Sequence, residues 1–291
     1  MNLSFSSLEL LHTCPRKFEL NKLCAPDGAG EGESLDLIAG KATHSGIQAL
    51  LAGKSLEHAV WEAYQEYSIR PNVDILERNK KKSFPLVVQH IIKFDMSAPL
   101  SEWRLAKIKN HWGETKDAIE LGFRIELPNG HFYRGFIDAI LENADGEFAA
   151  LEIKTSGFEN ANEALWQNSF QGMSYALIAD LVTQKRNPQQ LFLILEFPKL
   201  GQQVMRFWRS REDKLSWLPS LALDVNMLET YKKNRFFPMR GGSCFQYYRT
   251  CPHLGVCNLT RPEYTTEEKL EKPEDYDFNF TLDTLLNFAK G

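Results

Sequence analysis

Two carboxylates and one ammonium group fall on two neighbouring segments that predict β-strands. Asp138 ends the run Arg-Gly-Phe-Ile-Asp, and Glu152 and Lys154 belong to the run Leu-Glu-Ile-Lys. Because side chains alternate faces along a strand, Glu152 and Lys154 should point the same way, and Asp138 can approach them from the next strand. Carboxylates held together repel each other, which a divalent cation relieves, and hard oxygen ligands favour Mg²⁺ or Mn²⁺. Such a site can activate water and neutralise charge on a phosphodiester. The alternative is a solvated hairpin with an ordinary cross-strand Glu/Lys pair.

The elements that must position these side chains follow from periodicity and turn residues. Asn-Gly and Asp-Gly, both strong turn signals, separate the first three of five segments that predict strands. The fourth is almost entirely apolar and suits a buried strand. The strands are residues 120–127, 132–141, 148–155, 191–197 and 203–208. Helical periodicity covers residues 6–23, 35–51, 56–67, 73–95, 161–181 and 215–231. We therefore predict an α/β (α+β) fold in which a central mixed sheet of about five strands is flanked by helices.

Three further polar side chains lie on predicted helices. His44 shares a helix face with apolar residues at three- and four-residue steps. A histidine in such a place is usually a satisfied core or surface residue, and as a metal ligand it would need carboxylates from elsewhere. Gln171 and Tyr175 are four residues apart and share a face. The alternative for them is a polar pair on an exposed face.

The composition limits the class of protein. The chain has 291 residues, 43% of them apolar and 25% charged, as in a soluble globular protein. No apolar run is long enough to span a membrane, and the N-terminus does not resemble a signal peptide, so we expect an intracellular, cytoplasmic protein. The net charge of -4 means that a nucleic acid would be held by local basic patches. Arg16/Lys17, residues 78–82 and Lys107/Lys109 are candidates, although any one of them alone is interpreted as a solvated surface.

The cysteines form a second group with possible ligand chemistry. Five cysteines in a chain of this kind argue against a disulfide framework and for metal or cluster ligation. Pro15 should break the first predicted helix and leave Cys14 at a bend. Four thiolates suit an iron–sulfur (4Fe–4S) cluster or a structural zinc ion, but zinc sites more often show two close cysteine pairs. Cys24 is interpreted as a buried or free thiol. The alternative to ligation is that the other cysteines are also buried and bind no metal. The other four are Cys14, Cys244, Cys251 and Cys257.

These motifs, in this order, resemble the PD-(D/E)XK nuclease superfamily and, within it, the RecB-like branch. The nearest similarity is to the iron–sulfur exonucleases: AddB-type nuclease domains, CRISPR-associated RecB-like exonucleases and phage relatives. Ile137 stands where the family's name-giving proline would be, and the interval between Cys244 and Cys251 is longer than in the best-known members. The resemblance is carried by Cys14-Pro-Arg-Lys-Phe18, Gly40-x-x-x-His44, Gly135-Phe-Ile-Asp138, Glu152-Ile-Lys154, Gln171-x-x-x-Tyr175 and the C-terminal cysteines.

The resemblance implies a role for each matching residue. Lys154 would orient or deprotonate the attacking water and stabilise the developing charge. The divalent metal would be bound by His44, Asp138, Glu152 and the carbonyl oxygen of Ile153.

Residues further along the chain would complete the site. Gln171 and Tyr175 would position the DNA strand or the lysine. A 4Fe–4S cluster, with zinc less favoured, would be held by Cys14, Cys244, Cys251 and Cys257.

The resemblance also implies the domain organisation. A single RecB-like nuclease domain would span residues 1–260, with a restriction-endonuclease-like core at about 116–210. Helical elaborations would occupy residues 1–115 and 211–260, and the cysteines would clasp the two ends of the domain together. Residues 261–291 would form an acidic C-terminal tail, either flexible and docking on a partner or packed as a helix on its own domain.

The implied function is that of a Mg²⁺- or Mn²⁺-dependent DNA exonuclease acting on single strands or DNA ends. It would serve DNA recombination, repair, or phage or CRISPR DNA processing, with a helicase or recombination protein as a possible partner. The alternative is a non-catalytic DNA-binding recombination-accessory module with the same fold and a structural metal cluster. Specific Mn²⁺ binding at Asp138 and Glu152 separates the two hypotheses.

Overall fold

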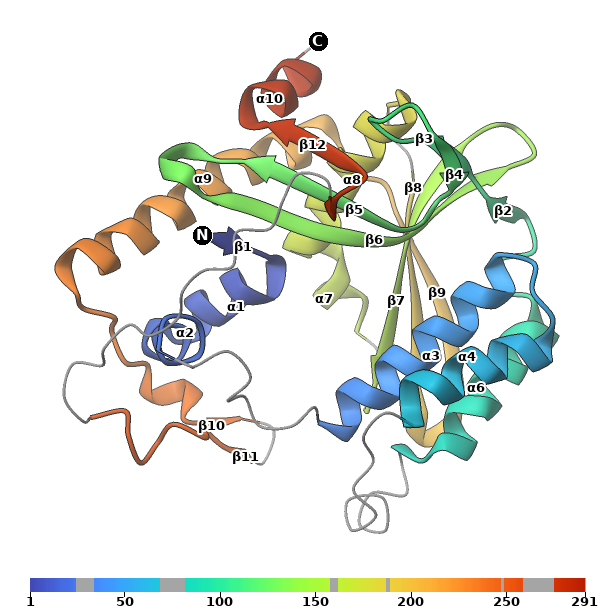
Figure 1. The fold of residues 1–291 in the computed structure, drawn as a ribbon, viewed down its shortest axis with the longest axis horizontal. Coiled ribbons are helices and arrows are strands. Elements are labelled where there is room, and N and C mark those ends of the chain that lie inside the picture. The colour runs from blue at the N-terminus through green and yellow to red at the C-terminus, as the bar shows by residue number, and fades with distance from the viewer. Residues whose placement is uncertain are drawn as a thin grey trace.

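A mixed β-sheet forms the centre of the protein (Figure 1). The computed structural model describes residues 1–24, 34–68, 82–157, 162–186, 189–246, 249–258 and 275–290. The strands of the sheet are β1 (Asn2–Leu3), β2 (Trp103–Leu105), β5 (Ile119–Glu126), β6 (Phe132–Asn143), β7 (Phe148–Ser156), β8 (Gln189–Glu196), β9 (Gly201–Phe207) and β12 (Phe278–Thr281).

The order of the strands confirms the predicted mixed α/β fold. The main path is β12-β5-β6-β7-β8-β9, and β1 and β2 also pair with β6. β5, β6 and β7 are antiparallel neighbours, whereas β7 and β8 run parallel. A parallel pair needs a crossover connection, which the helices α7 (Glu163–Gln167) and α8 (Phe170–Thr183) provide. This crossover brings a polar face of α8 against β7.

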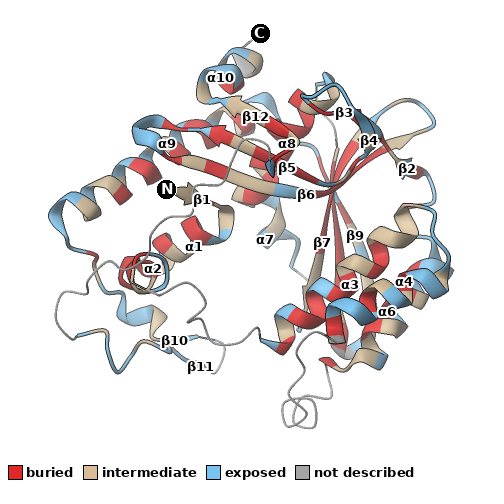
Figure 2. Ribbon diagram, viewed as in Figure 1, coloured by how far each residue is buried: buried red, intermediate tan, exposed pale blue. Residues whose placement is uncertain are grey.

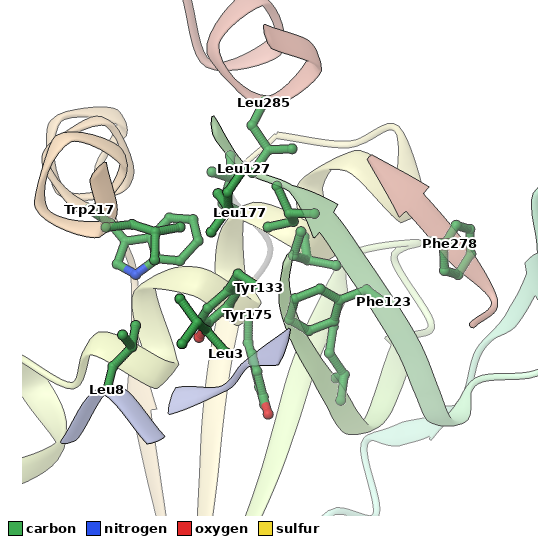
Figure 3. Packing of buried hydrophobic residues seen from close by; sticks show 14 of the residues in the cluster. Leu3, Leu8, Phe123, Leu127, Tyr133, Tyr175, Leu177, Trp217, Phe278 and Leu285 are labelled. Atoms are coloured by element: carbon green, nitrogen blue, oxygen red, sulfur yellow. The ribbon is translucent and has the colours of Figure 1, made fainter. Parts of the chain in front are cut away.

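Helices lie against the sheet, and buried residues form continuous runs along its central strands β6, β7 and β8 (Figure 2). One apolar cluster joins Ile47 and Phe94 to β6, β7 and β8, and a larger one centres on Tyr133 and Trp217 (Figure 3). The other helices are α1 (Phe5–Thr13), α2 (Pro15–Lys22), α3 (Leu35–Leu51), α4 (Leu56–Ser68), α6 (Phe84–Ser97), α9 (Arg211–Asn234) and α10 (Leu282–Lys290). Among the residues that the structure describes, no helix is long and apolar enough to cross a membrane.

The break predicted at Pro15 is present. α1 ends at Thr13 and α2 begins at Pro15, with Cys14 extended between them at φ −159°. Proline lacks an N–H and suits the first position of a helix, so it separates the two helices rather than bending one. Cys14 therefore sits at the N-terminus of α2, where the backbone N–H groups point outward.

The sheet is larger than the about five strands that we expected. β1, β2 and β12 contain two, three and four residues, which is too short for a period to be read from the sequence. Two further small ladders, β3 (Lys107–Lys109) with β4 (Thr115–Asp117) and β10 (Phe245–Gln246) with β11 (Arg249–Thr250), also lie in segments for which we predicted no strand.

Within the predicted C-terminal tail, the described residues 275–290 pack on the sheet and its core. β12 pairs parallel with β5, and Leu285 of α10 is buried in the larger apolar cluster. Asp277 Oδ2 accepts the N–H of Gly122 at 2.9 Å, and Oδ1 binds Lys116 at 2.7 Å. For residues 275–290 the structure thus shows packing on the chain's own core. The acidic run at 262–274 lies outside the described residues, as do residues 78–81 of the expected basic patch.

Gly135, on β6, packs closely against two aromatic rings of the larger apolar cluster. A Cβ atom added there would lie 2.8 Å from the Phe123 ring and 3.2 Å from that of Tyr175. We expect Gly135→Ala to lower the free energy of unfolding by about 1–3 kcal/mol, because both rings would have to move. Denaturant titration measures this loss. Gly242→Ala is the matched control, because nothing lies within 4 Å of its added Cβ; an equal, small effect of both changes would contradict the close packing.

Candidate active site

The residues implied as metal ligands meet where β6 and β7 separate. The last paired residues of this ladder are Ala139 and Leu151, so the register brings Asp138 opposite Glu152 one position further on. Asp138 Oδ2 accepts the N–H of Ile153 at 2.6 Å. His44, from α3, places Nδ1 3.8 Å from the same oxygen. Groups from three segments that are distant in sequence are therefore neighbours.

Lys154 and the polar face of α8 complete this arrangement. Lys154 Nζ lies 2.5 Å from Glu152 Oε1 and donates to Gln171 Oε1 at 2.9 Å. Gln171 Nε2 donates to Glu152 Oε1 at 2.9 Å and lies 3.1 Å from the Tyr175 hydroxyl. The expected four-residue pair thus faces the site rather than solvent. It fixes the glutamate and the lysine in one network.

Tyr175 links this network to the core. Its ring packs edge-on against Phe123 with centroids 5.7 Å apart, and Figure 3 shows its hydroxyl directed away from Leu177 and Leu285. Burial, followed by the charge of Glu152, raises the pKa of Tyr175 well above its ordinary value. The hydroxyl therefore stays protonated at neutral pH and serves as a hydrogen-bonding group.

Burial controls the ionisation of the site. It raises the pKa of Asp138 to about 7, against the opposing hydrogen bond from Ile153. Burial and then the charge of Asp138 raise the pKa of Glu152 to about 7. His44 is affected in the opposite sense: burial lowers its pKa to about 4, so the imidazole is neutral and can act as a ligand. The two carboxylates are costly neighbours at neutral pH.

The donor set fits a hard divalent cation. Asp138 and Glu152 are 8% and 4% exposed, and Glu152 Oε2 is buried without a hydrogen-bond partner. A buried carboxylate oxygen of this kind is normally paired or bound to a metal. In the described part of the chain, no three His, Cys, Asp or Glu side chains already stand close enough together to hold an ion. The side chains would therefore have to shift on binding.

The cysteines gather at a second place. A cavity of about 210 Å³ is lined by four of them, together with Arg240 and His253. Burial alone would raise the pKa of the Cys14 thiol. Hydrogen bonds from Lys17, Arg240 and Ser243 outweigh this effect and hold the pKa below its ordinary value. Cys24 does not line the cavity. The four lining thiols are Cys14, Cys244, Cys251 and Cys257.

Two residues near the site were not predicted from the sequence. Glu120 on β5 accepts a hydrogen bond from Gln48 Nε2 at 2.5 Å, and its charge raises the pKa of His44 and of Asp138. Two features could have identified these residues from the sequence. Gln48 follows His44 by four residues on one helix, and the hairpin register places Glu120 opposite Asp138.

Comparison with known proteins defines the class to which this fold and site belong. The chain is a member of the PD-(D/E)XK nuclease superfamily, whose family model matches residues 2–258. The resemblance inferred from the motifs is therefore confirmed at the level of the superfamily. No curated protein is similar to the chain in sequence.

Solved structures resemble the chain more loosely. A candidate exonuclease from Eubacterium rectale is 11% identical, with a TM-score of 0.48 over 94% of this chain and 90% of that one. The protein SSO0001 is 12% identical, with a TM-score of 0.31 over 78% of this chain and 76% of that one. Likenesses at this level carry no argument about activity.

Asp138→Asn should stabilise the metal-free protein at pH 8. The pKa of Asp138 is about 7 in the folded state against an ordinary 3.8, so the folded protein holds a proton that the unfolded chain has released. The contribution of this group to stability therefore falls as pH rises from about 4 to about 7, by about 4 kcal/mol at most. Asparagine does not ionise and can still accept the Ile153 N–H.

Urea unfolding in EDTA at pH 4.5 and pH 8 measures the difference. Wild type and variant should be similar at pH 4.5, and the variant more stable at pH 8. Asp117→Asn, at a half-exposed carboxylate on β4, is the control and should show no such change. If the difference in free energy of unfolding between variant and wild type is the same at both pH values, the raised pKa of the buried Asp138 is contradicted.

Proposed function

We propose that the protein is a metal-dependent DNA exonuclease that hydrolyses phosphodiester bonds of single strands or DNA ends. The observation that carries this proposal is the geometry around Glu152. Its Oε1 binds both Lys154 and Gln171, its Oε2 has no partner, and Asp138 lies opposite it. Carboxylates and a lysine in this arrangement are what metal-assisted phosphodiester hydrolysis requires.

Each residue has a defined task in this proposal. Asp138, Glu152, neutral His44 and the Ile153 carbonyl would hold Mg²⁺ or Mn²⁺, which supplies an activated water and neutralises phosphate charge when bound. The side chain of Lys154 is 28% exposed. Its positive charge can orient the attacking water and stabilise the developing oxyanion.

Gln171 and Tyr175 act as positioning groups in the same proposal. They keep Lys154 and Glu152 in place through the hydrogen bonds from α8. Because Gln171 both accepts from Lys154 and donates to Glu152, it fixes the orientation of the two side chains relative to each other.

A groove beside the site supports a nucleic acid as the substrate. It has a volume of about 1190 Å³, and Thr155 and Ser156, which directly follow Lys154, form part of its wall. Lys17 also lines it, together with Thr250, whereas Lys82 is buried in its wall and pairs with Asp36. Hydroxyl and ammonium groups are the usual partners of a sugar-phosphate backbone. A strand that follows this groove would reach the catalytic lysine from the side of the cysteine cavity.

The RecB-like, iron–sulfur assignment is part of the same proposal. We propose that Cys14, Cys244, Cys251 and Cys257 hold a 4Fe–4S cluster in the cavity that they line. The lowered pKa of Cys14 supports ligation, because the thiolate is the ligating form. The cluster would tie α2 to the loop after α9 and so support one wall of the groove. Roles in DNA repair, recombination or phage or CRISPR processing, with a helicase-type partner, follow from this branch.

Nuclease activity with linear and circular single-stranded DNA in Mn²⁺ tests the activity. Glu152→Gln and Lys154→Met should each reduce the rate by about 10²–10⁴-fold, and circular DNA should resist the wild-type protein. Lys185→Met is the matched control, because Lys185 lies beside Gly146 at the opposite end of β7. Degradation at the wild-type rate in either active-site variant would refute the assignment, and cleavage of circles would exclude an exonuclease.

Iron and acid-labile sulfide analysis of anaerobically purified protein tests the cluster. We expect a brown protein with a visible charge-transfer band, and Cys251→Ser should lose both iron and colour. Cys24→Ser is the control, because Cys24 does not line the cavity. A colourless wild-type protein that contains zinc would contradict the cluster and show a structural zinc ion instead.

A further inference from the structure

The five-residue helix α7 stands at the corner where the crossover from β7 turns into α8 (Figure 1). None of its five residues, all of which the structure describes, is buried, so the apolar core alone does not hold α7 in place. Its position matters, because Gln171 follows the end of α7 closely and must reach both Lys154 and Glu152. Other contacts must therefore fix this corner.

A row of aromatic rings joins α7 to the sheet. The ring of Trp166 lies 5.2 Å from that of Phe192 on β8, and Phe192 meets Phe207 on β9 edge-on at 5.8 Å. Arg209 follows Phe207 after one residue, and its guanidinium carbon lies 5.0 Å from the centre of the Phe207 ring. The row thus brings Arg209 beside the corner between α7 and α8.

The guanidinium group of Arg209 binds the end of α7. It donates from Nη2 to the carbonyl oxygen of Trp166 at 2.7 Å and from Nη1 to that of Gln167, the last residue of α7. From Nε it donates to Gln190 Oε1 at 2.9 Å. The last carbonyl groups of a helix have no partner within the helix and carry partial negative charge, which a cation satisfies.

Gln190 extends this contact to the first turn of α8. A Cβ atom added at Gly172 would lie 2.5 Å from Gln190 Oε1, so the amide fits here only because residue 172 has no side chain. Gly172 directly follows Gln171. Arg209 therefore binds the chain before the corner directly, and it reaches the chain after the corner through Gln190.

The burial of Arg209 makes this geometry specific. The residue is 4% exposed, and the three acceptors are neutral oxygens. Burying a charged group is costly unless its hydrogen bonds are satisfied, and the planar guanidinium satisfies several at fixed angles. A lysine or an apolar side chain could not bind all three oxygens, so the corner depends on the guanidinium group itself.

We propose that Arg209 is a positioning residue for the candidate active site. Because it fixes the corner between α7 and α8, it keeps Gln171 within hydrogen-bonding distance of Lys154 and Glu152. The inference rests on the proposed function, since the position of Gln171 matters for the reaction proposed there. A displacement of about 1 Å at a positioned group can cost about 10²-fold in rate.

A double-mutant cycle on the rate of Mn²⁺-dependent DNA hydrolysis tests the proposal. Arg209→Met and Gln171→Ala should each lower kcat by about 10–100-fold, with KM within about threefold of the wild-type value. The double variant should be no slower than Gln171→Ala, because Arg209 acts through Gln171. Circular dichroism establishes that each variant is folded at the assay temperature.

Lys214→Met is the matched control, because Lys214 is another buried cation that binds α8. Its Nζ lies 2.8 Å from Asp180 Oδ2, further along that helix than Gln171. Loss of this ion pair should lower the melting temperature. Its effect on kcat should stay within about threefold and should multiply with that of Gln171→Ala.

Gly172→Ala tests the same contact if Arg209→Met fails to fold. The added methyl group displaces Gln190 from Arg209, whereas alanine itself favours the helix. This variant should also lower kcat, and combining it with Gln171→Ala should lower kcat no further.

The outcomes separate this inference from the proposed function. A wild-type chain that hydrolyses no DNA overturns both. The inference alone is overturned if the effects of Arg209→Met and Gln171→Ala multiply, or if Arg209→Met raises KM at unchanged kcat. It is also overturned if either Arg209→Met or Gly172→Ala is folded and hydrolyses DNA at the wild-type rate.

Discussion

The burial of two like charges is the constraint on which the rest of the structure depends. Asp138 and Glu152 come from strands that diverge at this point, and each is almost inaccessible to water. Their raised pKa values express chiefly the cost of burying two carboxylates, which the charge of Lys154 offsets only in part. A fold that keeps such a pair sacrifices stability at this position, which is typical of residues kept for function.

The surrounding elements hold this pair in place. The antiparallel β6/β7 hairpin sets the register, and the crossover through α8 brings Gln171 to the glutamate and the lysine. α3 supplies His44 from the other direction. The polar network is joined to the apolar core through Tyr175, whose ring packs on Phe123 while its hydroxyl meets Gln171. The geometry of this candidate site therefore relies on the same packing that stabilises the sheet.

Much of this arrangement could be predicted from the sequence because its signals are local. Period-two alternation and the Asn-Gly and Asp-Gly turns gave the strands of the central hairpins, and the helix over residues 35–51 was predicted with its observed bounds. Spacing of four residues correctly placed Gln171 and Tyr175 on one face. Pro15 correctly marked the end of the first helix.

What the sequence did not reveal depends on contacts between distant segments. β12 has four residues and forms only because β5 offers an open edge and Asp277 can bind Gly122 and Lys116. Glu120 belongs to no motif, and its place opposite Asp138 follows from the pairing register of β5 and β6. The meeting of Cys14 with the distant cysteine loop was a hypothesis from composition, and the shared cavity is a property of the fold.

The most direct test of the central claim is a crystal of the protein soaked in Mn²⁺ and measured for anomalous scattering. The structure predicts an anomalous peak between the carboxylates of Asp138 and Glu152, within about 2.0–2.6 Å of an oxygen of each, with His44 and the Ile153 carbonyl turned toward it. A well-ordered site with no peak, or with Mn²⁺ bound only elsewhere on the chain, would contradict the account.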